Sequence, residues 1–115
     1  AYQKAIELNP AMSPAMENLG TLFFNSGYHQ QAEDFYRRAV EVDPSYPLAH
    51  FNLANLFDER GERAKALFHY LAALKANPRY ADAHYNLALL YQTMGETMKA
   101  LRHWKTYLKL DPGSN

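Results

Sequence analysis

The sequence contains no cysteine, which excludes a disulfide framework and a zinc site with cysteine ligands. It also lacks any apolar run close to the roughly 18 residues that a membrane-spanning helix needs. An excess of charge of either sign is missing too, because 12 Lys and Arg balance 12 Asp and Glu. No overall field would therefore draw the chain to nucleic acid or to an anionic membrane. These absences favour a neutral globular or repeat protein and leave its compartment open.

The sequence does contain an internal repeat. Hydrophobic residues make up 48% and charged residues 21% of the 115 positions, a composition typical of a folded domain. The same residue types recur every 34 positions, and a fixed period of that length predicts a repeat architecture. Three of the recurring residues are an Asn, a Gly and a Pro, which stand at 18, 27 and 44, at 52, 61 and 78, and at 86, 95 and 112.

Each period predicts two helices joined by a tight turn. Ser13 is predicted to cap the first helix, with Pro14 in its first helical position. Gly27 supplies the positive φ that lets the chain reverse within a few residues. The sequence starts in the middle of this pattern, so residues 1–12 are interpreted as the end of an earlier second helix and the chain as a fragment of something longer. Apolar residues spaced i, i+3, i+4 and i+7 predict helices over 13–26, 29–42, 47–60, 63–76, 81–94 and 97–110.

Small residues predict where the paired helices approach each other. Two antiparallel helices come close only where side chains are small, and neighbouring Leu, Phe and Tyr then fill the space around them. We therefore expect a set of recurring small residues to be buried between the helices of each pair. They are Gly20, Ala54 and Ala88 on the first helices and Ala32, Ala66 and Ala100 on the second.

This register of small residues, aromatic residues, Gly and Pro resembles the tetratricopeptide repeat. The resemblance implies an all-α fold, a right-handed α-solenoid of antiparallel helix pairs. It implies three full repeats at 13–46, 47–80 and 81–114, with the end of an earlier repeat at 1–12. The chain departs from the pattern at Tyr107, where the family has the small residue seen here at Ala39 and Ala73. The element that follows this repeat is therefore expected to pack differently.

The resemblance also implies a concave groove lined by the first helix of each repeat. A recurring Asn, at 18, 52 and 86, forms a ladder along it. An amide offers both a donor and an acceptor, so the ladder could pair with the backbone of an extended peptide. Alternatively, these amides bond the neighbouring helices. The residues that we expect to bind a peptide are Asn18, Thr21, Phe51, Asn52, Asn55, Asp58, Tyr85, Asn86, Leu89 and Gln92.

Residues 13–26, 47–59 and 81–94 of the predicted first helices carry carboxylates but neither Lys nor Arg. The partner is therefore predicted to be a protein or extended peptide of neutral or basic character. Chaperone-binding members of the family hold a C-terminal carboxylate with Lys and Arg on the groove. The corresponding positions here are Glu17, Thr21, Asn52, Asp82 and Asn86, and only Asn52 suits such a clamp. A peptide tail ending in EEVD is therefore not expected.

The last predicted helix, 97–110, is basic on one side and apolar on the other. With no following helix, part of the apolar side would be exposed, and such a patch marks a docking site or the scar of a truncation. The truncation is the favoured interpretation, because terminal repeats need capping. Self-association through this end is a further expectation.

No motif predicts catalysis or a cofactor. Four of the five histidines recur at repeat positions, His50 with His84 and His69 with His103. Equivalent residues of stacked repeats lie about 10 Å apart, too far to share a metal ion. These histidines are therefore interpreted as packing or surface residues. We predict no metal, cofactor, nucleic acid or membrane partner, and a non-enzymatic chain.

Three interpretations of the function remain open. The first is a scaffold that holds a peptide or protein segment in its groove. The second is the substrate- or partner-recognition array of a larger enzyme, as in glycosyltransferases that carry such repeats. The third is a sensory or assembly arm of a bacterial regulator. All three use the same groove, so the domains that flank the repeats would distinguish them.

Overall fold

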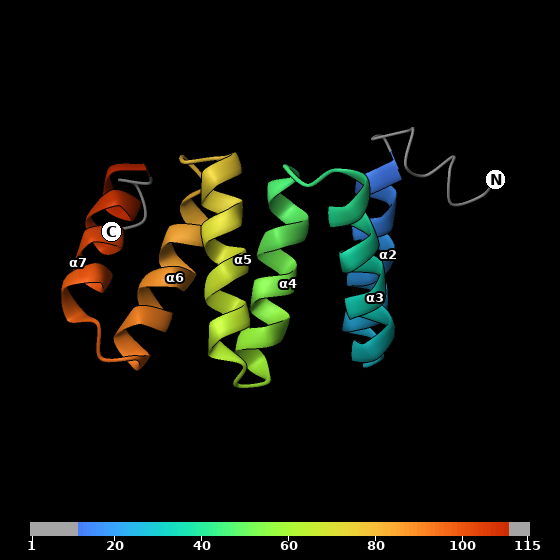
Figure 1. Ribbon diagram of the computed structural model, residues 1–115, viewed down its shortest axis with the longest axis horizontal. Coiled ribbons are helices and arrows are strands. Elements are labelled where there is room, and N and C mark those ends of the chain that lie inside the picture. Colours follow the sequence, from blue (N-terminus) through green and yellow to red (C-terminus); the bar gives the residue numbers. More distant parts are fainter. Residues whose placement is uncertain (1–11, 111–115) are drawn as a thin grey trace.

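The computed structural model describes residues 12–110, which form a row of paired helices (Figure 1). No helix in this part of the chain is long and apolar enough to cross a membrane. The turns at Pro44 and Pro78 separate one pair from the next. The helices are α2 (Met12–Asn25), α3 (His29–Val42), α4 (Pro47–Glu59), α5 (Arg63–Ala76), α6 (Ala81–Thr93) and α7 (Thr97–Leu110).

The helix boundaries lie within one residue of those predicted, but Ser13 and Pro14 do not have the roles predicted for them at the start of α2. Met12 is already helical, so Ser13 does not cap the helix and Pro14 is not its first residue. The Ser13 hydroxyl instead donates to the buried carbonyl of Ala39 at 2.8 Å. The cap prediction was wrong because a tertiary partner on α3 was invisible in the local sequence. The interpretation of residues 1–11 lies outside the described residues.

Each helix pair is joined by the same glycine turn. Gly27, Gly61 and Gly95 have φ values of 89°, 80° and 79°, the left-handed region that favours glycine. In the first turn the Tyr28 N–H donates to the carbonyl of Phe23 at 2.8 Å. The Gly27 N–H donates to the carbonyl of Phe24 at 3.0 Å. These two bonds form a Schellman motif, which satisfies carbonyls at the helix end and reverses the chain.

The expected small residues lie in the core, as predicted. Ala32, Ala54, Ala66 and Ala88 are fully buried, and Ala100 is nearly so. Gly20 has a specific reason to be small, because a Cβ atom there would lie 2.6 Å from Cε1 of Tyr36. The large side chains that fill the space around these residues include Leu53, Phe57, Tyr70 and Leu87.

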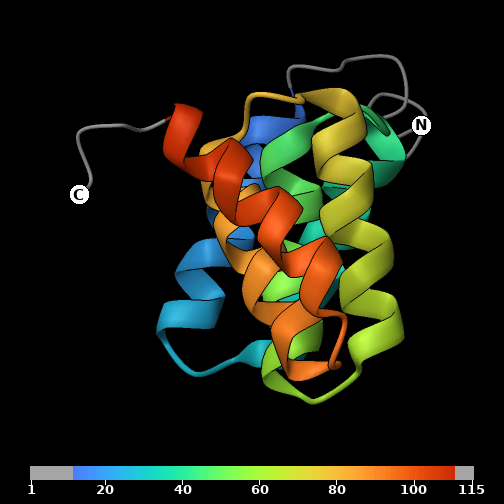
Figure 2. The same ribbon diagram turned by 90° about the vertical axis from the view of Figure 1, so that its left-hand side faces the viewer.

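The helix pairs stack into an α-solenoid that measures 48 × 25 × 23 Å. Viewed from the α7 end, the pairs lie one behind another (Figure 2). Neighbouring first helices contact each other, α2 with α4 and α4 with α6. The second helices reach the next repeat through its first helix, α3 with α4 and α5 with α6. The first helices therefore line the inner, concave side, and the second helices form the outer, convex side.

Tyr107 packs against an aromatic ring whose counterpart in the middle repeat packs against a different residue. In the middle repeat the Phe51 ring packs against Tyr80, the last residue of that repeat and the N-cap residue of α6, with centroids 5.0 Å apart. In the last repeat Tyr85 replaces Phe51, and its ring packs against Tyr107 of α7, with centroids 5.2 Å apart. The departure noted in the sequence thus has a physical role, because it covers an aromatic ring from within α7.

Candidate functional site

A cleft opens on the concave side where α4 and α6 meet. Its volume is about 340 Å³, and it contains four of the ten residues expected to bind a peptide. Tyr70 of α5 also lines it, although it was not among the residues expected to bind a peptide. Its lining consists of Asn55, Asp58, Glu59, Tyr70, Asn86 and Leu89.

Asn55 is the centre of a hydrogen-bond network in this cleft. Its Oδ1 atom accepts from the Tyr70 hydroxyl at 2.5 Å and from Nδ2 of Asn86 at 2.8 Å. Burial raises the pKa of Tyr70, and the nearby Asp58 carboxylate raises it further, so the hydroxyl stays protonated and donates. Because the oxygen takes both bonds, the amide NH₂ group of Asn55 is the part that can serve a ligand.

A second network joins α2 to α4 around the buried carboxylate of Glu17. Its Oε2 atom accepts from Nδ2 of Asn52 at 2.6 Å and from the Thr21 hydroxyl at 2.9 Å. Thr21 has one hydroxyl proton, which it gives to Glu17, so it accepts from the Tyr36 hydroxyl 2.9 Å away. The carboxylate is thereby satisfied by neutral donors, and both repeats contribute to it.

The asparagine ladder therefore does bond neighbouring helices at two of its three positions. Asn52 and Asn86 each give one N–H to the first helix of the preceding repeat. A primary amide has a second N–H and an oxygen with two lone pairs, so each can still bind another partner. Asn18 is exposed on α2. The asparagines therefore do form hydrogen bonds to neighbouring helices, and the remaining N–H groups and lone pairs of these amides can still bind a ligand.

The remaining candidates lie outside this cleft. Phe51 is half-buried, between Tyr70 and Tyr80. Tyr85 is 40% exposed, and its ring packs in a T-shaped arrangement with Trp104, with ring centroids 5.0 Å apart. Gln92 is exposed on α6. The structure thus brings four candidates together in the cleft and places Thr21 and Asn52 in the network around Glu17. The other four, Asn18, Phe51, Tyr85 and Gln92, lie outside both.

The electrostatics of the two sides differ. Among residues 12–110, every Lys and Arg lies on α3, α5 or α7 or in a turn. The concave cleft contains the carboxylates of Asp58 and Glu59, and Asp82 is exposed at the start of α6. The groove is therefore neutral to acidic, and the convex side is basic.

Histidines meet within a repeat, which the sequence analysis did not foresee. Nδ1 of His50 lies 3.0 Å from Nδ1 of His69, and Nδ1 of His84 lies 2.9 Å from Nδ1 of His103. The sequence analysis compared equivalent histidines of successive repeats, which belong to different pairs. The signal that would have found the pairs is the 19-residue spacing, common to both repeats. Their packing role is as expected, and residues 12–110 contain no cluster of three His, Asp or Glu side chains that could hold a metal ion.

Sequence comparison identifies the family. Models described as tetratricopeptide repeat match residues 13–46, 47–80 and 69–102. The chain belongs to the tetratricopeptide repeat family. The repeats of this family form a scaffold for protein–protein interaction. No curated protein matches the chain in sequence.

Several solved structures share this fold. A crystal structure of MamA is 27% identical, with a TM-score of 0.82 over 99% of this chain and 67% of that one. A second MamA structure is 26% identical, with a TM-score of 0.78 over 91% of this chain and 57% of that one. The second TPR of Spaghetti (RPAP3), bound to the HSP90 peptide SRMEEVD, is 20% identical, with a TM-score of 0.84 over 90% of this chain and 96% of that one. At 20% identity the likeness to RPAP3 shows the fold alone.

Proposed function

We propose that the chain is a non-catalytic interaction module that binds a peptide or protein segment in the groove formed by α2, α4 and α6. The observation that carries the proposal is the cleft around Asn55 and Asn86, where amide groups remain available beside the carboxylates of Asp58 and Glu59. Such amides can pair with the backbone of an extended peptide whatever its side chains. The concave surface of a helical-repeat stack is also the usual place for an extended ligand.

The charge of the groove favours a neutral or basic segment. Asp58 and Glu59 line the cleft, and the first helices carry neither Lys nor Arg. A carboxylate-rich ligand would lose its hydration there without gaining a cation in exchange. The acidic peptide SRMEEVD, bound by the RPAP3 repeats, is therefore a useful negative probe for this groove.

The test is a peptide array followed by binding in solution. Several hundred heptapeptides of varied charge, with SRMEEVD among them, are screened, and the strongest binders are titrated by fluorescence anisotropy. We expect neutral and basic peptides to dominate. Asp58→Asn with Glu59→Gln removes two carboxylates without changing shape and should weaken a basic peptide by roughly five-fold, or about 1 kcal/mol.

The matched control makes the same charge change on the convex side. Asp34→Asn with Glu41→Gln, both on α3, should leave peptide binding unchanged. If SRMEEVD binds as tightly as the basic peptides, the charge preference is wrong. If no peptide binds, or if binding survives Asn55→Ala with Asn86→Ala in a variant that melts normally, the groove is not the site.

A further inference from the structure

The concave cleft between α4 and α6 contains negative charge that no Lys or Arg balances. Asp58 and Glu59 both line it. Among residues 12–110 neither carboxylate forms an ion pair with a Lys or Arg. Nδ1 of His29 lies 3.8 Å from Oε1 of Glu59, which is longer than a hydrogen bond. The cleft therefore has two carboxylates that can receive a cation.

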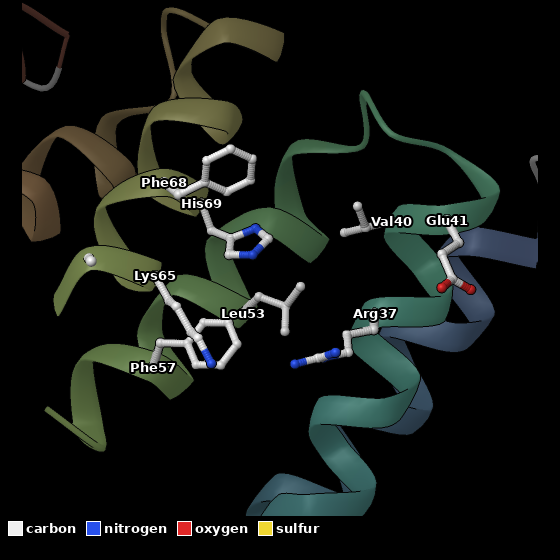
Figure 3. A pocket seen from close by; sticks show the side chains of 9 residues that line it. Arg37, Val40, Glu41, Leu53, Phe57, Lys65, Phe68 and His69 are labelled. Atoms are coloured by element: carbon white, nitrogen blue, oxygen red, sulfur yellow. The ribbon is translucent and has the colours of Figure 1, made fainter. Parts of the chain in front are cut away.

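The cleft on the convex side, between α3 and α5, has the opposite arrangement (Figure 3). Arg37 and Lys65 line it, and both are already paired. Nη2 of Arg37 lies 2.6 Å from Oε2 of Glu33, and Nζ of Lys65 lies 3.2 Å from Oε1 of Glu62. Glu41 adds a further carboxylate to its lining. The convex cleft thus has no charge left over for a ligand, and the concave cleft does.

The charge of the concave cleft is specific to the middle repeat. Thirty-four residues before Asp58 and Glu59 the equivalent positions hold Phe24 and Asn25. Thirty-four residues after them the positions hold Gln92 and Thr93. The pair of carboxylates therefore occurs once along the groove, so a cationic side chain that binds there would fix the register of an extended peptide.

The hydrogen-bonding groups of the cleft suit a ligand that donates. The Tyr70 hydroxyl has one proton, which goes to Asn55, so the Asp58 carboxylate 3.5 Å away receives no strong bond from it. Asn86 gives one N–H to Asn55 and keeps its own carbonyl oxygen as an acceptor. Leu89 also lines the cleft and is 42% exposed, so the apolar stem of a long side chain can lie against it.

We propose that this cleft is a subsite for one arginine side chain of the bound peptide. The inference rests on the function proposed above and adds to it a residue type and a position. A guanidinium group has five N–H donors and no acceptor, and it can bind a carboxylate through two parallel hydrogen bonds. Its methylene stem lies along Leu89, and the guanidinium group meets Asp58 and Glu59. Lysine has the same charge but no planar fork of donors, so it ranks second.

The test uses four capped nonapeptides of Ser and Ala that differ only at the fifth residue. This residue is arginine, citrulline, lysine or glutamate, and citrulline has the shape of arginine without its charge. Each peptide is titrated into the ¹⁵N-labelled protein, and amide shifts are followed. We expect the arginine peptide to shift Asn55, Asp58 and Asn86 most. The citrulline peptide should bind at least about five-fold more weakly, with lysine between the two and glutamate weakest.

The variant comes from the protein's own repeats. Asp58→Gln with Glu59→Thr installs the residues that α6 carries at the equivalent positions, so the fold should tolerate them. We expect it to weaken the arginine peptide by at least about five-fold and to leave the citrulline peptide unchanged, which separates lost charge from damage to the groove. The control, Asp82→Asn, removes an exposed carboxylate at the start of α6, outside the cleft lining, and should keep the preference for arginine over citrulline.

Several outcomes would overturn the subsite and leave the groove as a binding site. They are equal affinities for the arginine and citrulline peptides, shifts centred away from the cleft, and a preference for arginine that survives Asp58→Gln with Glu59→Thr. Peptides of the array that bind in the groove while the arginine nonapeptide does not would also overturn it. If neither the array peptides nor the arginine nonapeptide binds, the proposed function fails and the subsite fails with it.

Discussion

The histidine pairs make the stability of this solenoid depend on pH. Nε2 of His50 lies 2.8 Å from the carbonyl of Pro44, which can only accept, so this nitrogen carries the proton. The Nδ1 atom of a neutral His50 then accepts from the Nδ1–H of His69, 3.0 Å away. His84, His103 and the carbonyl of Pro78 repeat the arrangement, with both distances 2.9 Å. Each pair therefore excludes the doubly protonated state, because two imidazolium rings would place two N–H donors against each other.

Protonation works against this arrangement. Burial lowers the pKa of His69 to about 4, and His50 and Arg37 add to the effect. Burial also lowers the pKa of His103, together with His84 and Arg102. An unfolded histidine titrates near its ordinary pKa of about 6.5. Between that value and the folded pKa the unfolded chain binds more protons, so the stabilisation is complete above about pH 6.5 and is lost as the pH falls toward 4.

The magnitude follows from the size of the shift. A shift of one pKa unit corresponds to about 1.4 kcal/mol, so the shift of His69 sets a ceiling of about 3 kcal/mol. Because the ring is only partly buried, we expect about 1–2 kcal/mol from this pair after allowance for solvent screening. Most of the loss should fall between pH 7 and pH 5, before the carboxylates begin to titrate.

The assay is urea unfolding at a series of pH values from 7.5 to 5. The first repeat supplies the matched control, because Met16 and Phe35 stand where the later repeats have histidine. His50→Met with His69→Phe should reduce the pH slope of the unfolding free energy, and the same change at His84 and His103 should nearly remove it. An unchanged slope in the variant without the four histidines would refute the reasoning, whatever its absolute stability.

Three further predictions concern the folded state. Gly61→Ala places a Cβ atom at a φ of 80° and should cost about 1 kcal/mol in urea unfolding, whereas an unaffected midpoint would contradict a strained turn. Ala66→Leu overpacks a fully buried contact and should cost about 1–3 kcal/mol, so an unchanged melting temperature would argue against the packing. Burial works to raise the pKa of Glu33, but the hydrogen bond and charge of Arg60, with those of Arg37, outweigh it and lower the pKa. Glu33→Gln should therefore lower the free energy of unfolding by about 1–2 kcal/mol at pH 7, with a smaller difference from the parent below pH 4. An equal loss of stability at both pH values would show that charge is not the cause.

The repeat made most of the fold predictable. A pattern read three times over in register placed the helix ends to within one residue, and it identified the buried alanines and the turn glycines. The errors concern contacts between elements. Ser13 was given a local role as a helix cap, because its acceptor on α3 lies 26 residues away. Local sequence cannot reveal a partner that only folding brings close.

The binding role of the candidate residues stays a prediction. The resemblance to the family placed the asparagines on the groove side of the first helices, and their contacts with the preceding repeat came from the structure. Tyr70 was missed because a recurring aromatic is expected to be core, and its ring is indeed buried while its hydroxyl reaches Asn55. A residue that is both core and site cannot be assigned to the site from its periodicity.

The two junctions between repeats differ in their polar contacts, and this bears on how the solenoid would respond to a pulling force. Glu33 and Arg60 join the first repeat to the second with an ion pair of 2.6 Å, beside the bond from Asn52 to Glu17. At the second junction the equivalent positions are Leu67 and Met94, and a bond from Asn86 to Asn55 holds the polar side. Because each repeat contacts only its neighbours, tension along the stack would act on each junction in series. The second junction would extend first, which would widen the cleft at Asn55 before the rest of the groove changes shape.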